Sequence, residues 1–132
     1  MAIKELIGKV INKVYISDDH VLLKFTCIDR ESIIYVAEAD CCNDVWFNHI
    51  NGLQNLIGAV VISVHDKPTI EDATPTKQDE DIIYGWTVVT ANGYFDVEMR
   101  NSSNGYYGGT LSLYPNELVT EDLVFKELES DF

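Results

Sequence analysis

Positively charged residues are scarce in this chain, and their scarcity excludes several classes of partner. Nine lysines and arginines stand against 22 aspartates and glutamates among 132 residues, so the formal net charge is −13. Only Arg30 and Arg100 are arginines. Because duplex nucleic acid and anionic membranes are bound through many Lys and Arg contacts, we expect neither bulk nucleic acid nor a membrane as a partner. A basic protein surface or a small ligand in a local pocket remains compatible with this charge.

Cysteines and long apolar runs are also few. The three cysteines are Cys27, Cys41 and Cys42, and an odd number with an adjacent pair is unsuited to a disulfide framework. The first residues lack the apolar run of a signal peptide, and no stretch approaches the roughly 20 apolar residues that a membrane span needs. These features favour a reducing, cytoplasmic location. With 46% hydrophobic residues, the chain has the composition and length of a single globular domain over 1–132.

Alternating apolar residues and short polar turns predict an antiparallel β-sheet meander at the start of the chain. Its strands are expected over 10–16, 21–27 and 33–36, with polar turns at 17–20 and 29–32. Further strands are expected over 59–64, 82–90, 94–100 and 110–114. Asn92-Gly93 predicts a type I′ hairpin turn, since both central residues of that turn need positive φ.

Helical spacing is predicted at two places. Val45, Trp46, His49 and Ile50 are spaced as in a short helix, with Asn43 or Asp44 as its cap and one more helical turn over 53–57. Pro115 and the apolar residues that follow predict a C-terminal helix or an extended tail over 115–132. The prediction is therefore an α+β fold of about six to seven strands, one short helix after the third strand and a possible C-terminal helix. The core would span about 6–114, and residues 66–81 would form an exposed acidic loop.

Residues 100–109 hold the most informative polar cluster, and we predict a ligand-binding loop there. Glycines allow backbone N–H groups to converge on an anion, Arg100 can clamp a phosphate or carboxylate, and Tyr106 or Tyr107 can stack on a base. Tyr84, Trp86 or Asn92 would line the opposite wall. The simpler alternative is a β-turn with Asn104-Gly105 at its tip and the tyrosines in the core. The candidate ligand-binding residues are Arg100, Asn101, Ser102, Ser103, Asn104, Gly105, Tyr106, Tyr84, Trp86 and Asn92.

No catalytic or metal site is predicted. The adjacent Cys41 and Cys42 do not have the spacing of zinc ligands, and His49 is seven residues away without a second ligand pair. Cys41 and Cys42 are expected to be buried small hydrophobic residues. Phosphate-loop, dinucleotide-binding and nucleophile-elbow motifs are missing from the sequence. We therefore expect a protein that is not an enzyme and carries no cofactor.

Two stretches of the sequence resemble a known family. The first is 35–42 with Trp46-Phe47 and 50–52, and the second is 100–109. The signatures within them are Asp40-Cys41-Cys42 and Ser102-Ser103-Asn104-Gly105-Tyr106-Tyr107. Together they resemble the first-described Thoeris anti-defence family of phages and prophages over most of residues 6–113. The resemblance implies a homo-oligomeric sponge, a dimer or larger, that binds a cyclic ADP-ribose isomer or cyclic oligonucleotide without cleaving it. It also implies that Ser103, Asn104, Gly105 and Tyr106 contact this ligand, with Arg100 nearby.

Three functions follow from these observations. The first is sequestration of a cyclic nucleotide immune signal in the cytoplasm of an infected or lysogenic bacterium, with each site shared between two copies of the chain. The second is an acidic inhibitor that binds a basic host protein, with mimicry of nucleic acid as one way to do so. The net charge of −13 and the acidic runs Glu71-Asp72 and Asp79-Glu80-Asp81 favour it. The third is an enzyme that acts on a nucleotide.

Overall fold

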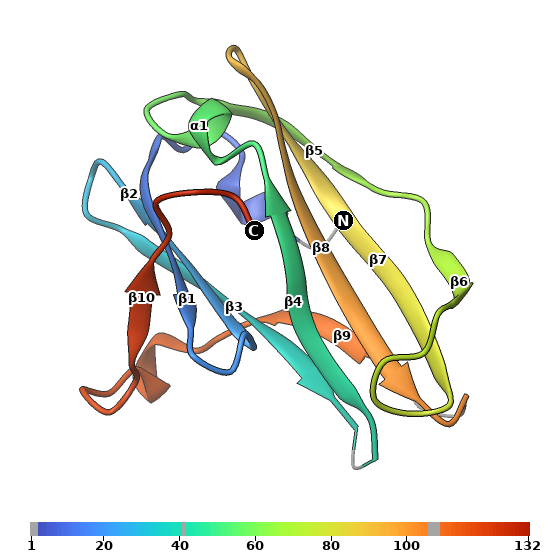
Figure 1. The fold of residues 1–132 in the computed structure, drawn as a ribbon. Helices are drawn as coiled ribbons and strands as arrows, with labels where there is room; N and C mark the ends of the chain where they lie inside the picture. Colours follow the sequence, from blue (N-terminus) through green and yellow to red (C-terminus); the bar gives the residue numbers. More distant parts are fainter. Residues whose placement is uncertain (1–2, 41, 106–108) are drawn as a thin grey trace.

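The chain folds into two antiparallel β-sheets that pack around one core. The computed structural model describes residues 3–40, 42–105 and 109–132. One sheet has the strand order β10-β1-β2-β3-β9, and the other has the order β4-β8-β7-β5, with β6 also paired to β7. Figure 1 shows the two sheets side by side, with α1 and the β7–β8 turn at one end and the β3–β4 turn at the other. The predicted α+β class is therefore wrong, because strands dominate the described residues.

The strands account for most of the described chain. They are β1 (Ile11–Ser17), β2 (Leu22–Cys27), β3 (Ser32–Ala39), β4 (Asp44–Asn51), β5 (Val61–Asp66), β6 (Ile70–Ala73), β7 (Glu80–Thr90), β8 (Gly93–Ser103), β9 (Gly109–Leu113) and β10 (Phe125–Glu127). The helical elements are η1 (Lys4–Leu6), α1 (Leu53–Leu56) and η2 (Asn116–Leu118). The predicted meander is confirmed by the antiparallel pairing of β1 with β2 and of β2 with β3.

The short helix predicted over residues 45–50 is wrong, since these residues form β4. Val45, Phe47 and Ile50 face the core and are 5%, 0% and 0% exposed. The pairing of β4 with β8 shifts between Phe47 and His49, which marks a β-bulge. A bulge adds one residue to the strand and changes the spacing of core positions from two to three, so the apolar residues imitate a helical period. The further helical turn predicted over 53–57 is confirmed as α1.

The C-terminal helix is also wrong. After the single turn η2, residues Phe125–Glu127 form β10, which pairs with the free edge of β1. The final residues then cross from β10 towards β4 and α1 (Figure 1). Only Leu128 of the apolar residues proposed for this helix packs against the core cluster.

The loop predicted over 66–81 is more ordered than expected. Residues Ile70–Ala73 pair with β7, and β7 itself begins at Glu80. The hairpin predicted at Asn92-Gly93 is confirmed, but its central residues are Ala91 and Asn92, since Thr90 pairs with Gly93. Among the residues that the structure describes, His20 and Arg30 are the only non-glycine residues with positive φ. Asn92 therefore lacks the conformation of a type I′ turn, and Gly93 takes the positive φ of 133° instead.

Candidate functional site

The strand β8 divides the predicted ligand loop between two faces of its sheet. Residues Arg100 to Ser103 are the end of β8 rather than a loop. Successive strand residues point to opposite faces, so Arg100 and Ser102 lie on the outer face, and Asn101 and Ser103 lie on the inner face towards the other sheet. Since β8 pairs with both β4 and β7 up to Ser102, its backbone amides belong to the sheet. The predicted nest of free amides does not form at these residues.

The outer face holds a buried ion pair that takes up Arg100. Its Nη1 lies 3.3 Å from Oδ2 of Asp81, and the two side chains are 16% and 0% exposed. Thr76 donates to the same carboxylate through its hydroxyl at 2.6 Å and its backbone N–H at 3.3 Å. Burial alone would raise the pKa of Asp81, but hydrogen bonds from Ser102 and Thr76 and the charge of Arg100 outweigh it and lower the pKa. The anion clamp expected of Arg100 is therefore already filled by a carboxylate of the chain.

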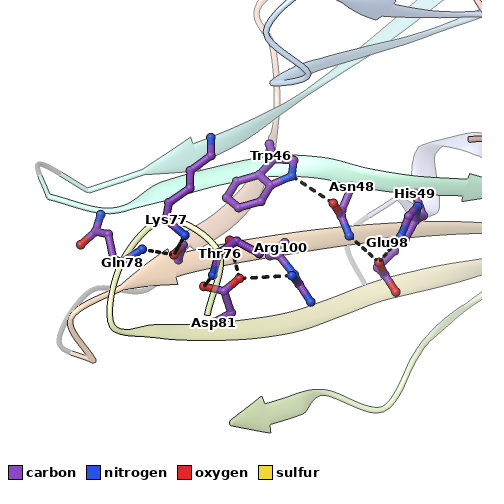
Figure 2. A network of polar contacts seen from close by, with 10 residues as sticks. Trp46, Asn48, His49, Thr76, Lys77, Gln78, Asp81, Glu98 and Arg100 are labelled. Carbon is purple, nitrogen blue, oxygen red and sulfur yellow. Dashed lines mark hydrogen bonds and ion pairs between the residues drawn. The ribbon is translucent and has the colours of Figure 1, made fainter. Parts of the chain in front are cut away.

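The turn over residues 76–78 is held against the outer face, as Figure 2 shows. The hydroxyl oxygen of Ser102 accepts hydrogen bonds from the backbone N–H of Gln78 at 2.9 Å and of Lys77 at 3.3 Å. The Gln78 amide donates to the carbonyl of Cys42, and Lys77 Nζ lies 4.3 Å from the centroid of the Trp46 ring. This part of the acidic segment is therefore bound to the sheet. Asp81 in particular cannot contribute to an exposed acidic surface that imitates nucleic acid.

The polar outer face continues along β4 and β8 away from this turn. Trp46 donates to Asn48, Asn48 donates to Glu98, and His49 Nε2 lies 3.8 Å from Glu98 (Figure 2). Beyond them is a hollow of about 510 Å³ whose walls carry one lysine, one histidine and three carboxylates. Its lining residues are His49, Ile50, Asn51, Lys67, Asp96, Glu98, Asp131 and Phe132. Because Lys67 is already close to Asp96, the balance of charge makes this hollow a poor site for an anion.

The inner face holds a second polar group, which is almost free of charge. Asn101 and Ser103 are 1% and 2% exposed, and Asn43 donates a 2.8 Å hydrogen bond to Asn101. Beside them, the hydroxyl of Tyr84 is buried and has no hydrogen-bond partner among the residues described. Burial raises the pKa of Tyr84 to about 12, so the hydroxyl stays protonated and can donate. A buried hydroxyl without a partner is uncommon because it costs about 1–3 kcal/mol.

Two glycines allow close packing beside this inner group. A Cβ on Gly109 would lie 2.6 Å from the Tyr84 hydroxyl and 2.5 Å from a Val45 methyl group. Gly105 has φ +96°, and its N–H donates to the Ser103 hydroxyl at 3.0 Å. A Cβ on Gly105 would lie 2.9 Å from a carboxylate oxygen of Glu80, which is paired across the sheet with Ser103. The inner group, defined as Asn43, Glu80, Tyr84, Asn101 and Ser103, therefore combines neutral polar side chains with one carboxylate at its rim.

The structure brings together only part of the predicted site. Asn101, Ser103, Tyr84 and Gly105 are near one another at the inner face, with Asn104 exposed beside them. Trp86 is 7% exposed in the core, edge-on to Tyr84 with 6.2 Å between ring centroids. Asn92 lies at the far end of β8, on the order of 26 Å from Arg100 at about 3.3 Å per residue. Tyr106 lies outside the described residues.

Sequence reasoning missed several residues that form these groups. Trp46 was assigned to a helix, and Thr76, Gln78 and Asp81 to an exposed loop, yet all four lie on the outer face. Val45, Trp46 and Phe47 are three consecutive apolar residues, so the sequence of β4 has no clear strand alternation that would have placed Trp46 on the outer face. No sequence pattern indicates that Thr76 and Asp81 meet Arg100.

Cysteine placement differs from the prediction in part. The burial expected of Cys42 is wrong, because this residue is exposed, and Cys41 lies outside the described residues. Cys27, for which no burial was predicted, is buried. One group of possible metal ligands occurs among the residues described, with ligand atoms of Cys27, Asp29 and Glu31 within 4.8 Å of one another. Glu31 is already paired with Lys9, which competes with a cation for its carboxylate. Among the described residues no helix has the length and apolarity needed to cross a membrane.

Comparison with known proteins identifies a family and a viral relative. Residues 4–113 match the model of a family described as a domain of unknown function, DUF7448. "Uncharacterized protein L278" of Acanthamoeba polyphaga mimivirus is 33% identical over 109 residues, which cover 79% of this chain and 86% of the relative. No solved structure matches.

Proposed function

This chain belongs to the DUF7448 family, and we propose that it binds and sequesters a small nucleotide ligand. The description of the family assigns no activity, so the proposal is argued from the residues of this chain. The ligand class to test first is the cyclic nucleotide immune signal, either a cyclic ADP-ribose isomer or a cyclic oligonucleotide. The mimivirus relative supports a viral setting for such a protein. The proposed binding site is the inner group at the end of the two sheets.

The observation that carries this proposal is the buried hydroxyl of Tyr84, which has no partner in the described part of the chain. Protein interiors rarely retain such a group without a role. A ligand that accepts a hydrogen bond from it would recover the free energy that its burial costs. We therefore place the ligand against Tyr84, with Asn101 and Ser103 as its polar neighbours.

The chemistry of the inner group favours the nucleoside part of the ligand over its phosphates. Asparagine and serine side chains offer both donors and acceptors, which suit the edge of a base. The carboxylate of Glu80 can accept hydrogen bonds from ribose hydroxyls or from an exocyclic amine. Arg100 is committed to Asp81 on the opposite face, so we do not assign it to a phosphate.

Binding without cleavage is part of the proposal. Glu80 is the one carboxylate of the inner group, and Tyr84 stays protonated near neutral pH because its pKa is raised to about 12. Acid–base chemistry on a nucleotide commonly needs a base and an acid whose pKa values lie near the working pH. The group as defined offers no such pair.

A capture-and-release experiment tests both parts of the proposal. The protein is incubated with a cyclic ADP-ribose isomer or a cyclic oligonucleotide, unbound material is removed, and the protein is denatured so that released ligand can be assayed. Recovery of intact ligand is expected. An altered product would contradict sequestration without cleavage, and no uptake of either ligand would contradict the proposed ligand class.

The substitution Tyr84→Phe tests the site, because it removes only the hydroxyl. We expect ligand affinity to fall about tenfold, the equivalent of about 1.4 kcal/mol for one hydrogen bond. The melting temperature without ligand should stay the same or rise, because a buried hydroxyl without a partner is lost. Tyr94→Phe is the matched control, since Tyr94 is 64% exposed at the other end of the sheet. Unchanged affinity in Tyr84→Phe would remove Tyr84 from the site.

A further inference from the structure

The C-terminal segment, residues 125–132, joins the edges of the two sheets. β10 pairs with β1 through Tyr15↔Glu127, Ile16↔Lys126 and Ser17↔Phe125, and the N–H of Leu128 donates to the Val14 carbonyl. Farther along, Phe132 and Ile50 exchange two backbone hydrogen bonds of 3.0 and 3.1 Å. This segment therefore covers edge strand β1 of one sheet and edge strand β4 of the other.

Side chains of the segment add contacts to this pairing. The two carboxylate oxygens of Asp131 accept hydrogen bonds from the N–H groups of Gly52 at 3.0 Å and Leu53 at 2.9 Å, at the start of α1. The ring of Phe132 lies edge-on to His20, with 5.2 Å between centroids. The docking of residues 125–132 is thus specified by their own backbone and side chains, and would be the same whichever chain supplied them.

The linker over residues 114–124 connects this segment to β9 and has few contacts of its own. In the described part of the chain, the backbone N–H of Tyr114 donates to the Ile34 carbonyl of the sheet, and the other backbone hydrogen bonds of the linker are turns within it. It nevertheless exposes large apolar side chains, with Leu118, Val119 and Val124 at 55%, 44% and 63%. Burial of these side chains against a partner would remove apolar surface from water.

We propose that two copies of this chain form a dimer by exchanging their C-terminal segments. Each copy docks residues 125–132 against β1 and β4 of the other, so that all contacts of the segment are kept. The two linkers then run past each other across the two-fold axis and bury Leu118, Val119 and Val124 between them. In a monomer that docks its own C-terminal segment, these side chains stay in water. Their burial favours the exchanged dimer, because exchange of an identical segment keeps its other contacts and costs little free energy.

The linker also carries like charges that oppose this dimer. Glu117, Glu121 and Asp122 of the two copies would come close together, and salt screens such repulsion. Dimer formation should therefore strengthen as ionic strength rises. An interface held by pairs of opposite charges would weaken under the same change.

A disulfide across β1 and β10 tests the exchange directly. Tyr15 and Glu127 are opposite each other in antiparallel pairing, where Cα atoms are about 4.5–5.5 Å apart and a disulfide can form. The variant Tyr15→Cys and Glu127→Cys is made in the full chain with Cys41→Ser and Cys42→Ser, and is oxidised at high protein concentration. A covalent dimer on a non-reducing gel is expected. A covalently closed monomer as the only product would overturn the proposal.

Shortening the linker supplies a second test that needs no new cysteine. Four strand spacings separate β9 from β10, or about 19 Å at 4.8 Å each. Deleting residues 117–123 leaves four Cα–Cα steps from Tyr114 to Phe125, about 14 Å at most, so the segment cannot reach its own β1. We expect an obligate dimer by sedimentation equilibrium, and replacement of the same residues by an equally long Gly-Ser segment as the control should give a monomer. A shortened chain that stays monomeric would overturn the proposal.

Discussion

At the scale of single residues, the buried pair of Asp81 and Arg100 sets the character of the outer face. Two ionic side chains that are 0% and 16% exposed are tolerated because each meets an opposite charge, and Thr76 and Ser102 add hydrogen bonds to the carboxylate. The pair holds the turn over residues 76–78 against β8. It also removes the arginine that the sequence marked as an anion clamp.

Replacing Asp81 by Asn should make the protein less stable, and the loss should depend on pH. The folded-state pKa of Asp81 lies below its ordinary value of 3.8. Its contribution to stability is therefore present above that value and is lost as the pH falls through the depressed pKa. We expect the melting temperature of Asp81→Asn to be lower than that of the parent chain at pH 7, and the difference to shrink as the pH falls below 3.8.

Calorimetric or circular-dichroism melts of the two proteins across this pH range measure the difference. Asp66→Asn is a suitable control, since Asp66 is an exposed residue at the end of β5. A difference in melting temperature between Asp81→Asn and the parent that stayed constant from pH 7 to pH 3 would contradict the assigned role of the carboxylate.

At the scale of elements, the junction between β4 and α1 shows how local sequence and long-range packing act together. Gly52 precedes α1 with φ +87°, a conformation that favours glycine, and a Cβ there would lie 2.1 Å from the backbone carbonyl oxygen of Tyr94. The same junction receives the carboxylate of Asp131 on the N–H groups of Gly52 and Leu53. Three distant segments therefore meet at one glycine.

The substitution Gly52→Ala should destabilise the fold more than Gly58→Ala. Gly58 has a similar φ of +82°, but nothing lies within 4 Å of the place of its Cβ. We expect Gly58→Ala to cost about 1–2 kcal/mol for the left-handed conformation alone. Gly52→Ala should cost more, because the backbone of β8 must also move. Equal free energies of unfolding in urea would show that the close approach to Tyr94 is not a constraint.

At the scale of the whole molecule, the net charge of −13 destabilises the folded state, because like charges repel one another in a compact chain. Several of the few basic side chains lie close to acids, as in Lys13 with Glu127 at 3.7 Å and Lys67 with Asp96 at 3.8 Å. Such pairs on the surface contribute little stability each, so most of the excess negative charge remains uncompensated. Repulsion among acids is then a general term in the stability of the protein.

Added salt should therefore stabilise the folded chain. Screening weakens repulsion between surface carboxylates over distances of about 10 Å at 0.1 M ionic strength. We expect the melting temperature at neutral pH to rise between low and moderate concentrations of sodium chloride. A fall over the same range would indicate that attractive ion pairs outweigh the repulsion.

Part of the candidate site could be predicted from sequence, and part could not. Asn101, Ser103 and Gly105 were proposed from composition, because polar residues and glycines concentrated in one stretch are detectable locally, and Tyr84 was proposed as an aromatic residue for the opposite wall. The prediction treated Arg100 and Asn101 as parts of one loop, so it could not show that they lie on opposite faces of the sheet. They do so because β8 extends through both residues. The partnership of Arg100 with Asp81 depends on the alignment of β7 with β8.

The order and pairing of the first strands were determined by the sequence itself, because alternating apolar residues between short polar turns require antiparallel neighbours. Tertiary structure alone decided that β4 is a strand, since its bulge imitates the period of a helix and only the pairing with β8 distinguishes the two. It also decided the course of residues 125–132, whose extended form depends on an open edge of β1 far away in the sequence. The physical reason is the same in both cases, because a β-strand satisfies its backbone hydrogen bonds through other segments, whereas a helix satisfies them within itself.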